Sequence, residues 1–149
     1  MFADHTSSEG DGWYKTSMGK FSIPILFFEP GNKKDIKISE KIFQQIDIMP
    51  TILEKLNYPK KYFGFGNGLS NDNRFAISIL NGVYHFVTRN YFILFDGENI
   101  IAVYNWKNDR MLQNNLKETT EYTEDFNLLK AILQTYNKSM KENKLVVNN

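Results

Sequence analysis

The sequence predicts a mixed α/β chain, in which the end of a parallel sheet precedes a four-stranded antiparallel meander packed by a C-terminal helix. Three observations predict this fold class. Residues 21–29 are a nearly continuous apolar run, which is typical of a strand buried on both faces. Four short aromatic and β-branched runs then follow one another closely, as antiparallel strands do. Residues 122–141 carry apolar side chains at helical spacing.

The composition is that of a folded domain without a strong charge preference. The chain has 149 residues, of which 42% are hydrophobic and 23% charged, so a core is expected and disorder is not. The 18 basic and 17 acidic residues are interspersed, which argues against nucleic acid as a partner. The absence of cysteine excludes disulfides, zinc–thiolate sites and cysteine nucleophiles. No apolar run approaches the roughly 20 residues that span a bilayer, so this chain itself is expected to be soluble.

The first part of the chain is expected to run from strand to loop to strand. Residues 1–5 read as the last residues of a strand. Residues 6–20 are small, polar and glycine-bearing, which predicts a long loop, and loops of this length often have a function. Pro24 lies inside the apolar run that follows, so this strand is expected at a sheet edge or with a local irregularity.

A short helical region is expected next. Ser39 can cap a helical turn that continues through Gln45. Asp47 can cap a helix over residues 47–57, and Pro50 then falls in the first turn, where a missing N–H costs little.

The meander and the last helix are expected to form a unit from local connections. Asn81-Gly82 is a strong signal for a two-residue hairpin turn. The four strands are expected at residues 75–80, 83–88, 91–95 and 100–106. The helix presents one apolar stripe that can cover a face of the sheet, formed by Phe126, Leu129, Leu133, Tyr136 and Met140.

Asp4 and His5 are the first candidates for chemistry. Adjacent Asp and His residues at the carboxyl end of a strand can both reach one metal ion, because open α/β sheets place ligands at that end. A carboxylate oxygen and an imidazole nitrogen are suitable ligands for zinc, manganese and similar ions. Taken alone, the same pair is also compatible with an ordinary surface position.

Three sequence blocks give this pair a context. Phe2-Ala3-Asp4-His5-Thr6 is followed by a Ser/Gly loop, then by Ser22-Ile23-Pro24-Ile25-Leu26, then by Gln45-Ile46-Asp47-Ile48-Met49-Pro50-Thr51-Ile52-Leu53. This order resembles the sulfatase family of the alkaline-phosphatase superfamily. Within it, the chain looks most like the lipoteichoic-acid-synthase-like, or phosphoglycerol transferase, branch. The later segments that carry this resemblance are Tyr62-Phe63-Gly64-Phe65-Gly66, Asn81-Gly82-Val83-Tyr84, Leu94-Phe95-Asp96-Gly97 and Leu112-Gln113-Asn114-Asn115-Leu116.

The resemblance implies an alkaline-phosphatase-like α/β fold and a metal-dependent enzyme. Residues 1–60 would be the C-terminal end of the catalytic domain, and residues 61–149 a subdomain of antiparallel sheet and helix. Asp4 and His5 match two metal ligands of the family, whose cation would be manganese, zinc, magnesium or calcium. The nucleophile and the remaining acidic ligand are expected upstream, in a missing N-terminal catalytic half, so no catalytic nucleophile is expected in this chain.

The implied substrate is a phosphate ester of the cell envelope, or, as an alternative, a sulfate ester. The intact protein would be anchored in the cell membrane with its catalytic domain outside the cytoplasm. A further alternative, of a different class, is a non-catalytic structural or binding module formed by the meander and the last helix.

The other candidate residues also have simpler structural explanations. Trp13 and Tyr14 can stack on a substrate group in the cleft or can cap the sheet edge. His85 lies mid-strand among aromatic residues and is expected to be packed. Asp47 and Thr51 can be explained by the helix start alone. A site built within the loop itself, from Thr6, Ser7, Ser8, Glu9 and Asp11, is not expected, and Lys33, Lys34 and Lys37 are expected to form a solvated loop.

Overall fold

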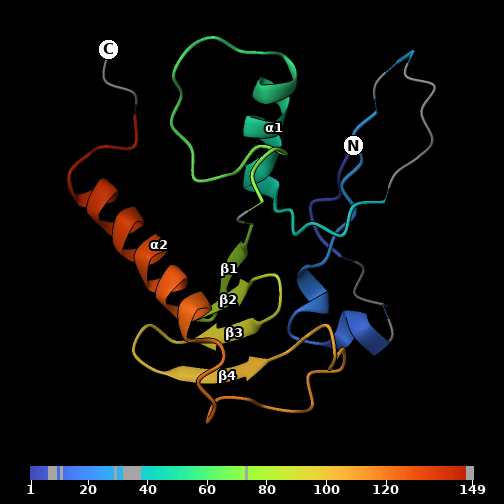
Figure 1. Ribbon diagram of the computed structural model, residues 1–149, viewed down its shortest axis with the longest axis vertical. Helices are drawn as coiled ribbons and strands as arrows, with labels where there is room; N and C mark the ends of the chain where they lie inside the picture. The colour runs from blue at the N-terminus through green and yellow to red at the C-terminus, as the bar shows by residue number, and fades with distance from the viewer. Residues whose placement is uncertain (7–9, 11, 29, 32–37, 73, 147–149) are drawn as a thin grey trace.

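Strands and helices occupy mainly the second half of the chain (Figure 1). The computed structural model describes residues 1–6, 10, 12–28, 30–31, 38–72 and 74–146. Three short 3₁₀ helices and one α-helix come first, at η1 (Gly12–Lys15), η2 (Gly19–Phe21), η3 (Gln45–Asp47) and α1 (Ile48–Lys55). The sheet and the long helix follow, as β1 (Ala76–Leu80), β2 (Val83–Val87), β3 (Phe92–Phe95), β4 (Ile100–Tyr104) and α2 (Thr123–Lys141).

The predicted meander is confirmed, with strand order β1-β2-β3-β4 and each neighbouring pair antiparallel. Leu80 pairs with Val83 across a two-residue turn, in which Asn81 has φ 51° and Gly82 has φ 79°. Both values lie in the left-handed region, which asparagine tolerates and glycine adopts without a Cβ clash. The strand ends differ from the predicted ends by one or two residues because the flanking residues enter the turns.

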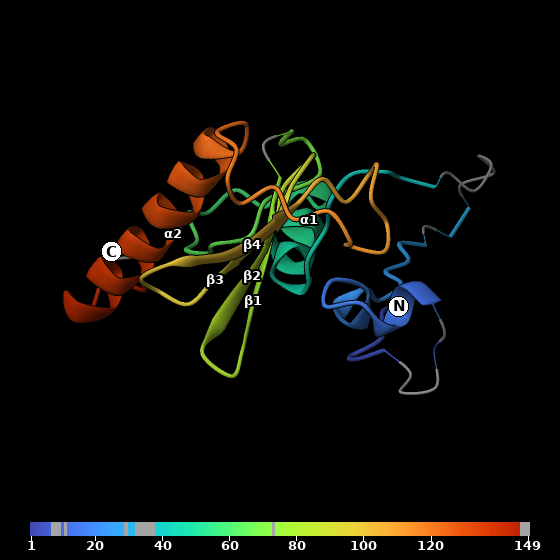
Figure 2. The same ribbon diagram turned by 90° about the horizontal axis from the view of Figure 1, so that it is seen from below.

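One face of the sheet packs against α2 and forms the core (Figure 2). Side chains alternate along each strand, so residues two apart share a face. The fully buried side chains include Phe86, Ile93 and Val103 from the sheet and Leu129 from α2. The predicted apolar stripe of the last helix therefore supplies part of the core, with Phe126 and Leu133 packing beside Leu129.

The other face of the sheet meets the N-terminal segment, which lies across the sheet from α2 in Figure 2. His85 of β2 is only 7% exposed, and its ring lies edge-on to Phe21 of η2 at 5.1 Å and to Phe92 of β3 at 5.8 Å. The His85 Nδ1 atom is 3.3 Å from the Ser17 carbonyl oxygen. The prediction that His85 is a packed residue is confirmed.

The predicted parallel sheet and its apolar strand were wrong for the residues that the structure describes. Phe2 and Ile25 form one isolated antiparallel bridge, flanked by the hydrogen bonds of Leu26 N–H to the Met1 carbonyl and Ala3 N–H to the Pro24 carbonyl. Neither segment continues as a strand. A single bridge leaves most backbone groups without a ladder partner, and Pro24 has no N–H to donate.

The helical region also differs from prediction. The turn expected from Ser39 to Gln45 is absent, and the Ser39 hydroxyl instead accepts a hydrogen bond from Lys41 N–H at 3.2 Å. Asp47 precedes α1 but makes no side-chain cap to it. Its carboxylate accepts from the backbone N–H groups of Gln44, at 3.1 Å, and Asn67, at 2.7 Å.

Asp47 and Arg74 form a buried ion pair that joins α1 to the sheet. The Arg74 Nη1 atom lies 3.3 Å from the Asp47 Oδ2 atom, and the two side chains are 3% and 1% exposed. The guanidinium also donates to the backbone carbonyls of Ile42, Asn67, Gly68 and Asn71. Because a buried charge needs both a counter-charge and hydrogen-bond partners, this arrangement fixes the connector between α1 and β1.

Candidate functional site

Asp4 and His5 lie side by side on the surface of the N-terminal segment. Their side chains are 87% and 81% exposed, and the His5 Nε2 atom is 3.7 Å from the Asp4 Oδ1 atom. The His5 Nδ1 atom lies 2.9 Å from the Thr6 carbonyl oxygen. A carbonyl can only accept a hydrogen bond, so Nδ1 carries the hydrogen and, in the neutral ring, Nε2 keeps the lone pair that a metal requires.

The environment of His5 favours its protonated form. The hydrogen bond to the Thr6 carbonyl, followed by the Asp4 carboxylate, raises the pKa of His5 above its ordinary value. A proton and a metal ion compete for the same Nε2 lone pair, so any metal binding at this pair strengthens as the pH rises through the pKa of His5.

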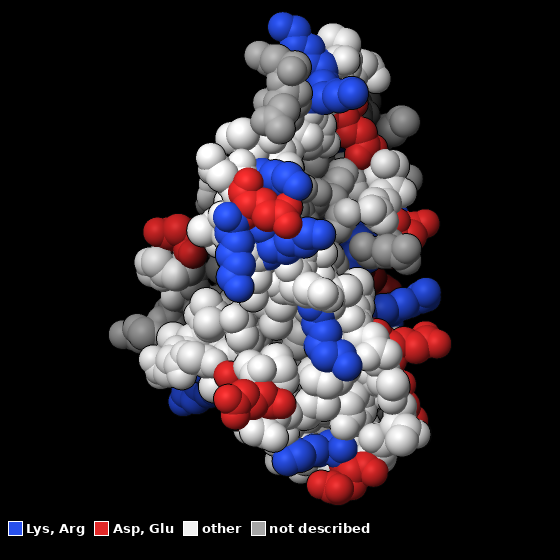
Figure 3. Space-filling model, turned by 90° about the vertical axis from the view of Figure 1, so that its left-hand side faces the viewer, with Lys and Arg blue, Asp and Glu red and all other residues white. Residues whose placement is uncertain are grey.

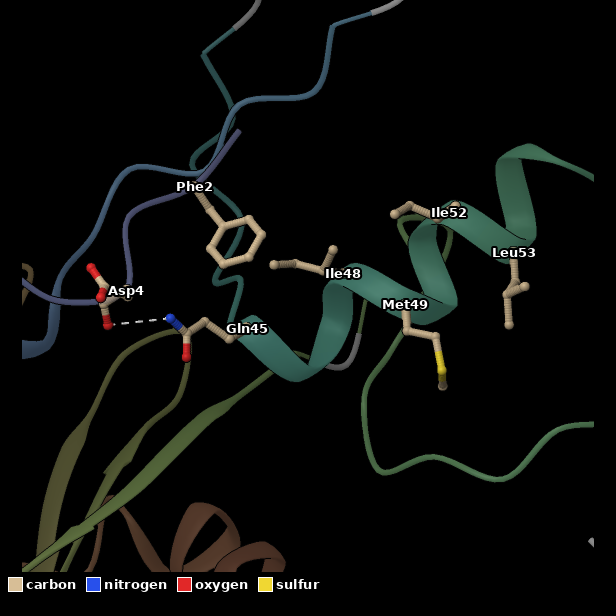
Figure 4. Close-up of a pocket in the computed structure, with 7 residues that line it drawn as sticks. All are labelled: Phe2, Asp4, Gln45, Ile48, Met49, Ile52 and Leu53. Atoms are coloured by element: carbon tan, nitrogen blue, oxygen red, sulfur yellow. Dashed lines mark hydrogen bonds between the residues drawn. The ribbon is translucent and has the colours of Figure 1, made fainter. Parts of the chain in front are cut away.

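Gln45 connects the Asp4-His5 segment to the start of α1 (Figure 4). Its Nε2 atom lies 3.3 Å from the Ala3 carbonyl oxygen and 3.4 Å from the Asp4 carbonyl oxygen. The Phe2–Ile25 bridge holds the same segment on its other side. The three sequence blocks that carry the family resemblance therefore meet at one place, although more than 40 residues of chain separate Gln45 from Asp4.

An open apolar groove adjoins Asp4. It has a volume of about 590 Å³ and runs along the exposed side of α1. Figure 4 shows Phe2 at one end, beside Ile48, and Met49 and Ile52 along the helix. The only ionisable side chain among its described lining residues is that of Asp4.

The donors suit a divalent metal ion in kind but are too few for a complete site. A tetrahedral ion about 2.1 Å from each ligand needs the two ligand atoms roughly 3.4 Å apart. The observed separation of 3.7 Å between Nε2 and Oδ1 is close to this value. Within the described ranges, however, no group of three or more His, Asp or Glu side chains is placed to hold a metal ion. Asp4 and His5 can therefore supply two ligands and need others from elsewhere.

The two aromatic candidates, Trp13 and Tyr14, both belong to η1 but differ in surroundings. The Trp13 ring lies under the Arg110 guanidinium at 4.7 Å, so a contact with the loop after β4 already covers it. Tyr14 is 49% exposed. Of the two, Tyr14 is the one that is free to contact a ligand.

The remaining candidates have structural partners or lie outside the described residues. The Thr6 hydroxyl donates to the Lys20 carbonyl at 2.6 Å, which leaves it poorly placed as a nucleophile. Thr51 is fully buried in α1, but its hydroxyl has no hydrogen-bond partner among the described residues, so it does not cap the helix start. Several candidates lie outside the described residues, namely Ser7, Ser8, Glu9, Asp11, Lys33, Lys34 and Lys37.

Sequence reasoning missed Gln45 and Arg74, which organise this region. Gln45 is predicted as the end of a helical turn and the first residue of the third block, with no contact assigned to its side chain, and Arg74 has no assigned role. Their contacts span 41 and 27 residues, and no local pattern predicts contacts over such distances. The available signal was compositional, because Arg74 is an isolated basic residue at the entrance to an apolar strand.

Neither the surface charge nor comparison with known proteins points to a particular function. On the face that Figure 3 presents, lysine and arginine are interspersed with aspartate and glutamate. Within the described part of the chain, no helix combines the length and the apolar character needed to cross a bilayer. Comparisons with protein-family models, curated proteins and solved structures found no match.

Proposed function

We propose that this chain is the C-terminal part of a metal-dependent enzyme of the sulfatase and alkaline-phosphatase superfamily, in its phosphoglycerol transferase branch. The proposed substrates are phosphate esters of the cell envelope. The observation that carries the proposal is the contact of Gln45 with the backbone of Asp4, at 3.4 Å. This contact supports the proposal that the sequence blocks belong to one site, because it joins the motif of the helix start to the motif of the metal ligands.

In this proposal, Asp4 and His5 hold a divalent cation together with ligands from outside this sequence. The bound cation supplies positive charge that stabilises the phosphoryl group and lowers the pKa of the nucleophile. Within this chain, the Thr6 carbonyl orients the His5 ring, and Gln45 fixes the Asp4 backbone. The exposed Tyr14 ring is available to contact the substrate.

The apolar surface near the ligand pair supports the idea that another part of the enzyme covers it. Phe28 is 79% exposed, Leu26 is 48% and Phe2 is 53%. On α1, Met49 is 46% exposed and faces the groove beside Asp4. Exposed apolar side chains beside an apolar groove are typical of a contact site for another protein surface. In the proposed arrangement, residues 1–60 complete a catalytic α/β domain of the alkaline-phosphatase type, and residues 61–149 form its appended subdomain.

Paramagnetic NMR with manganese tests the metal ligands. Added Mn²⁺ should broaden the signals of Asp4 and His5 first, with millimolar affinity, because two ligands make a weak site. The broadening should fall sharply in the Asp4→Asn and His5→Gln variants. Leu133 of α2 provides the internal control, since α2 packs on the opposite face of the sheet from the N-terminal segment and its signals should stay sharp.

The proposal fails if broadening is strongest at other exposed carboxylates, such as those of Asp72 or Glu142. Binding of micromolar affinity or tighter would contradict the incomplete site. The chain alone should not hydrolyse phosphate or sulfate esters in the presence of Mn²⁺ or Zn²⁺, and turnover that His5→Gln abolishes would show that the site is complete.

A non-catalytic module is a second candidate, which the location of the core favours. The buried hydrophobic cluster lies entirely between Phe86 and Leu129, so the meander and α2 hold the core without the N-terminal segment. The comparison of residues 70–149 with the full chain tests this candidate. Equal cooperative unfolding of both would favour the module, whereas a large loss of stability on truncation would favour a single enzyme fragment.

A further inference from the structure

A second pocket lies on the connector between α1 and β1, and among the described lining residues it shares only Leu53 with the groove beside Asp4. The connector curls back past the C-terminal end of α1, as the green loop in Figure 1 shows. The pocket between them has a volume of about 470 Å³. The side chains that define its chemistry are Glu54, Asn57, Tyr58, Tyr62, Asn67 and Asn71.

The lining of this pocket is polar and aromatic but carries little charge. None of the described residues that line it is basic, so a phosphate or sulfate group would find no counter-charge. Among its described lining residues the only carboxylate is that of Glu54, so a divalent cation would find little negative charge. Amides both donate and accept hydrogen bonds, and a carboxylate accepts them, which matches the hydroxyl groups of a neutral ligand.

Two tyrosines supply the apolar part of the wall. Tyr58 and Tyr62 are each 45% exposed, so their rings and hydroxyl groups remain accessible. An aromatic ring offers an apolar face and, in tyrosine, a polar tip, which suits a ligand with C–H groups on one side and hydroxyls at its edge. The ring of a sugar has this combination of surfaces.

Hydrogen bonds within the protein hold the polar side chains of the pocket in place. The Glu54 carboxylate accepts from Ser70 N–H at 3.2 Å, and the Asn71 amide donates to the Asn67 side-chain oxygen at 2.7 Å. Arg74 binds the carbonyls of Asn67 and Asn71. These bonds form without a ligand, so binding would cost little additional ordering of the wall.

A glycine at position 68 leaves room for the Glu54 carboxylate that lines the pocket. A Cβ atom on Gly68 would lie 1.9 Å from a Glu54 carboxylate oxygen. Any larger residue would displace the carboxylate that faces the pocket.

We propose that this pocket binds a neutral polyhydroxylated ligand of the carbohydrate class. Glu54 and the amides of Asn57 and Asn67 bind its hydroxyl groups, and Tyr62 packs against its C–H face. The proposal does not depend on the metal ligands or on the proposed enzymatic function.

An amide NMR titration of the full chain tests the proposal. The probes are maltose, cellobiose and N,N′-diacetylchitobiose, with inorganic phosphate as the anionic comparison. At least one disaccharide should shift the amide signals of Asn57, Asn67 and Gly68 saturably with millimolar Kd, and phosphate should not. The proposal is overturned if none of the three disaccharides shifts these signals, or if phosphate shifts them more.

Variants separate a specific site from general surface contact. Tyr62→Ala should raise the Kd about 2- to 10-fold, the range expected for the loss of one aromatic packing contact. Asn67→Ala should also raise the Kd. If Tyr62→Ala loses its dispersed spectrum, Asn67→Ala serves as the test variant in its place. Asn137→Ala removes the same amide from the exposed surface of α2 and should leave the Kd unchanged. An unchanged Kd in both pocket variants overturns the proposal.

Discussion

The two halves of this molecule obtain their order in different ways. From Ala76 to Lys141, the backbone forms a continuous meander and a 19-residue helix, and large side chains such as Phe86 and Leu129 are fully buried. The described residues before Ile48 form three short 3₁₀ helices and one isolated bridge, and Phe28 remains 79% exposed. The second half is held together by its own core, whereas the first half relies on a few distant polar contacts.

Those contacts show what an irregular segment needs in order to stay in place. Ser17 meets His85 of the sheet, and Gln45 meets the Asp4 backbone. Arg74 and Asp47 join the start of α1 to the start of the sheet. The Arg74–Asp47 pair is buried and the Ser17–His85 contact is half-buried, so the loss of either costs more than the loss of an exposed hydrogen bond such as that of Gln45.

The largest expected effect is at Arg74, where the two halves are joined. Arg74→Ala leaves the buried Asp47 carboxylate without its counter-charge and should lower the free energy of unfolding by about 3 to 5 kcal/mol. Urea denaturation followed by circular dichroism measures the loss. As a control, Lys41→Ala breaks the exposed Lys41–Asp72 ion pair and should have little effect. If the two variants lost equal free energies of unfolding, burial would not explain the effect of the Arg74–Asp47 pair.

The core of the second half should be almost as sensitive. Leu129 is fully buried between α2 and the sheet, so Leu129→Ala should cost about 2 to 5 kcal/mol through lost burial and a residual cavity. Leu128→Ala is the matched control on the same helix. Leu128 is 41% exposed, so its replacement should lower the free energy of unfolding much less. Thermal unfolding of both variants measures the loss of stability. Similar losses would disprove the assignment of Leu129 to the core.

The hairpin turn should show a smaller effect, on its backbone alone. Gly82 has φ 79°, and alanine there should cost about 1 kcal/mol because its Cβ disfavours the left-handed region. Gly82→Asn should cost less, since asparagine tolerates this region better. The free energies of unfolding of the two variants, measured in urea, test this order, and the reverse order would exclude backbone strain as the cause.

The smallest effect should appear as a pH dependence of the contact between the halves. Burial, with a lesser contribution from Lys20, lowers the pKa of His85 below its ordinary value, although the Ser17 carbonyl opposes the shift. The folded chain then binds fewer protons than the unfolded chain. Its stability should be highest above the ordinary histidine pKa of about 6.5 and should fall as the pH drops toward the lowered pKa of His85.

Denaturation curves at about pH 7.5 and about pH 5.5 measure this dependence. His85→Gln should remove the fall in stability on acidification. His5→Gln should not remove it, because the pKa of His5 is raised and its protonation does not oppose folding. An unchanged fall in His85→Gln would assign the effect to another group.

The sequence predicts the second half well because its signals are local. Asn81-Gly82 specifies a turn, alternation specifies the faces of the strands, and the spacing around Leu129 specifies the buried side of the helix. In the first half, the same local patterns give a wrong prediction for residues 21–28. An apolar run suggests a buried strand, but among residues 21–28 only Ile25 forms a β-bridge.

The candidate site was predictable in its residue types and not in its setting. Asp4 and His5 were selected for their ligand chemistry and for the order of the following blocks. Their support by Gln45 and the pairing of Asp47 with Arg74 depend on contacts between distant segments. The capping box of η3, in which the Asp47 carboxylate accepts from Gln44 N–H, is local and agrees with the predicted helix start. One-dimensional spacing does not encode such contacts.

The contact between Ser17 and His85 also has a consequence for the order of folding events. It links residues 68 positions apart, whereas the strands of the meander pair with immediate neighbours. Local pairs close with little loss of chain entropy and form early, while distant pairs form late. During synthesis Ser17 leaves the ribosome before β2 and cannot dock until β2 has followed it. The phenylalanines of this segment therefore stay uncovered for a period in which the nascent chain is vulnerable to aggregation.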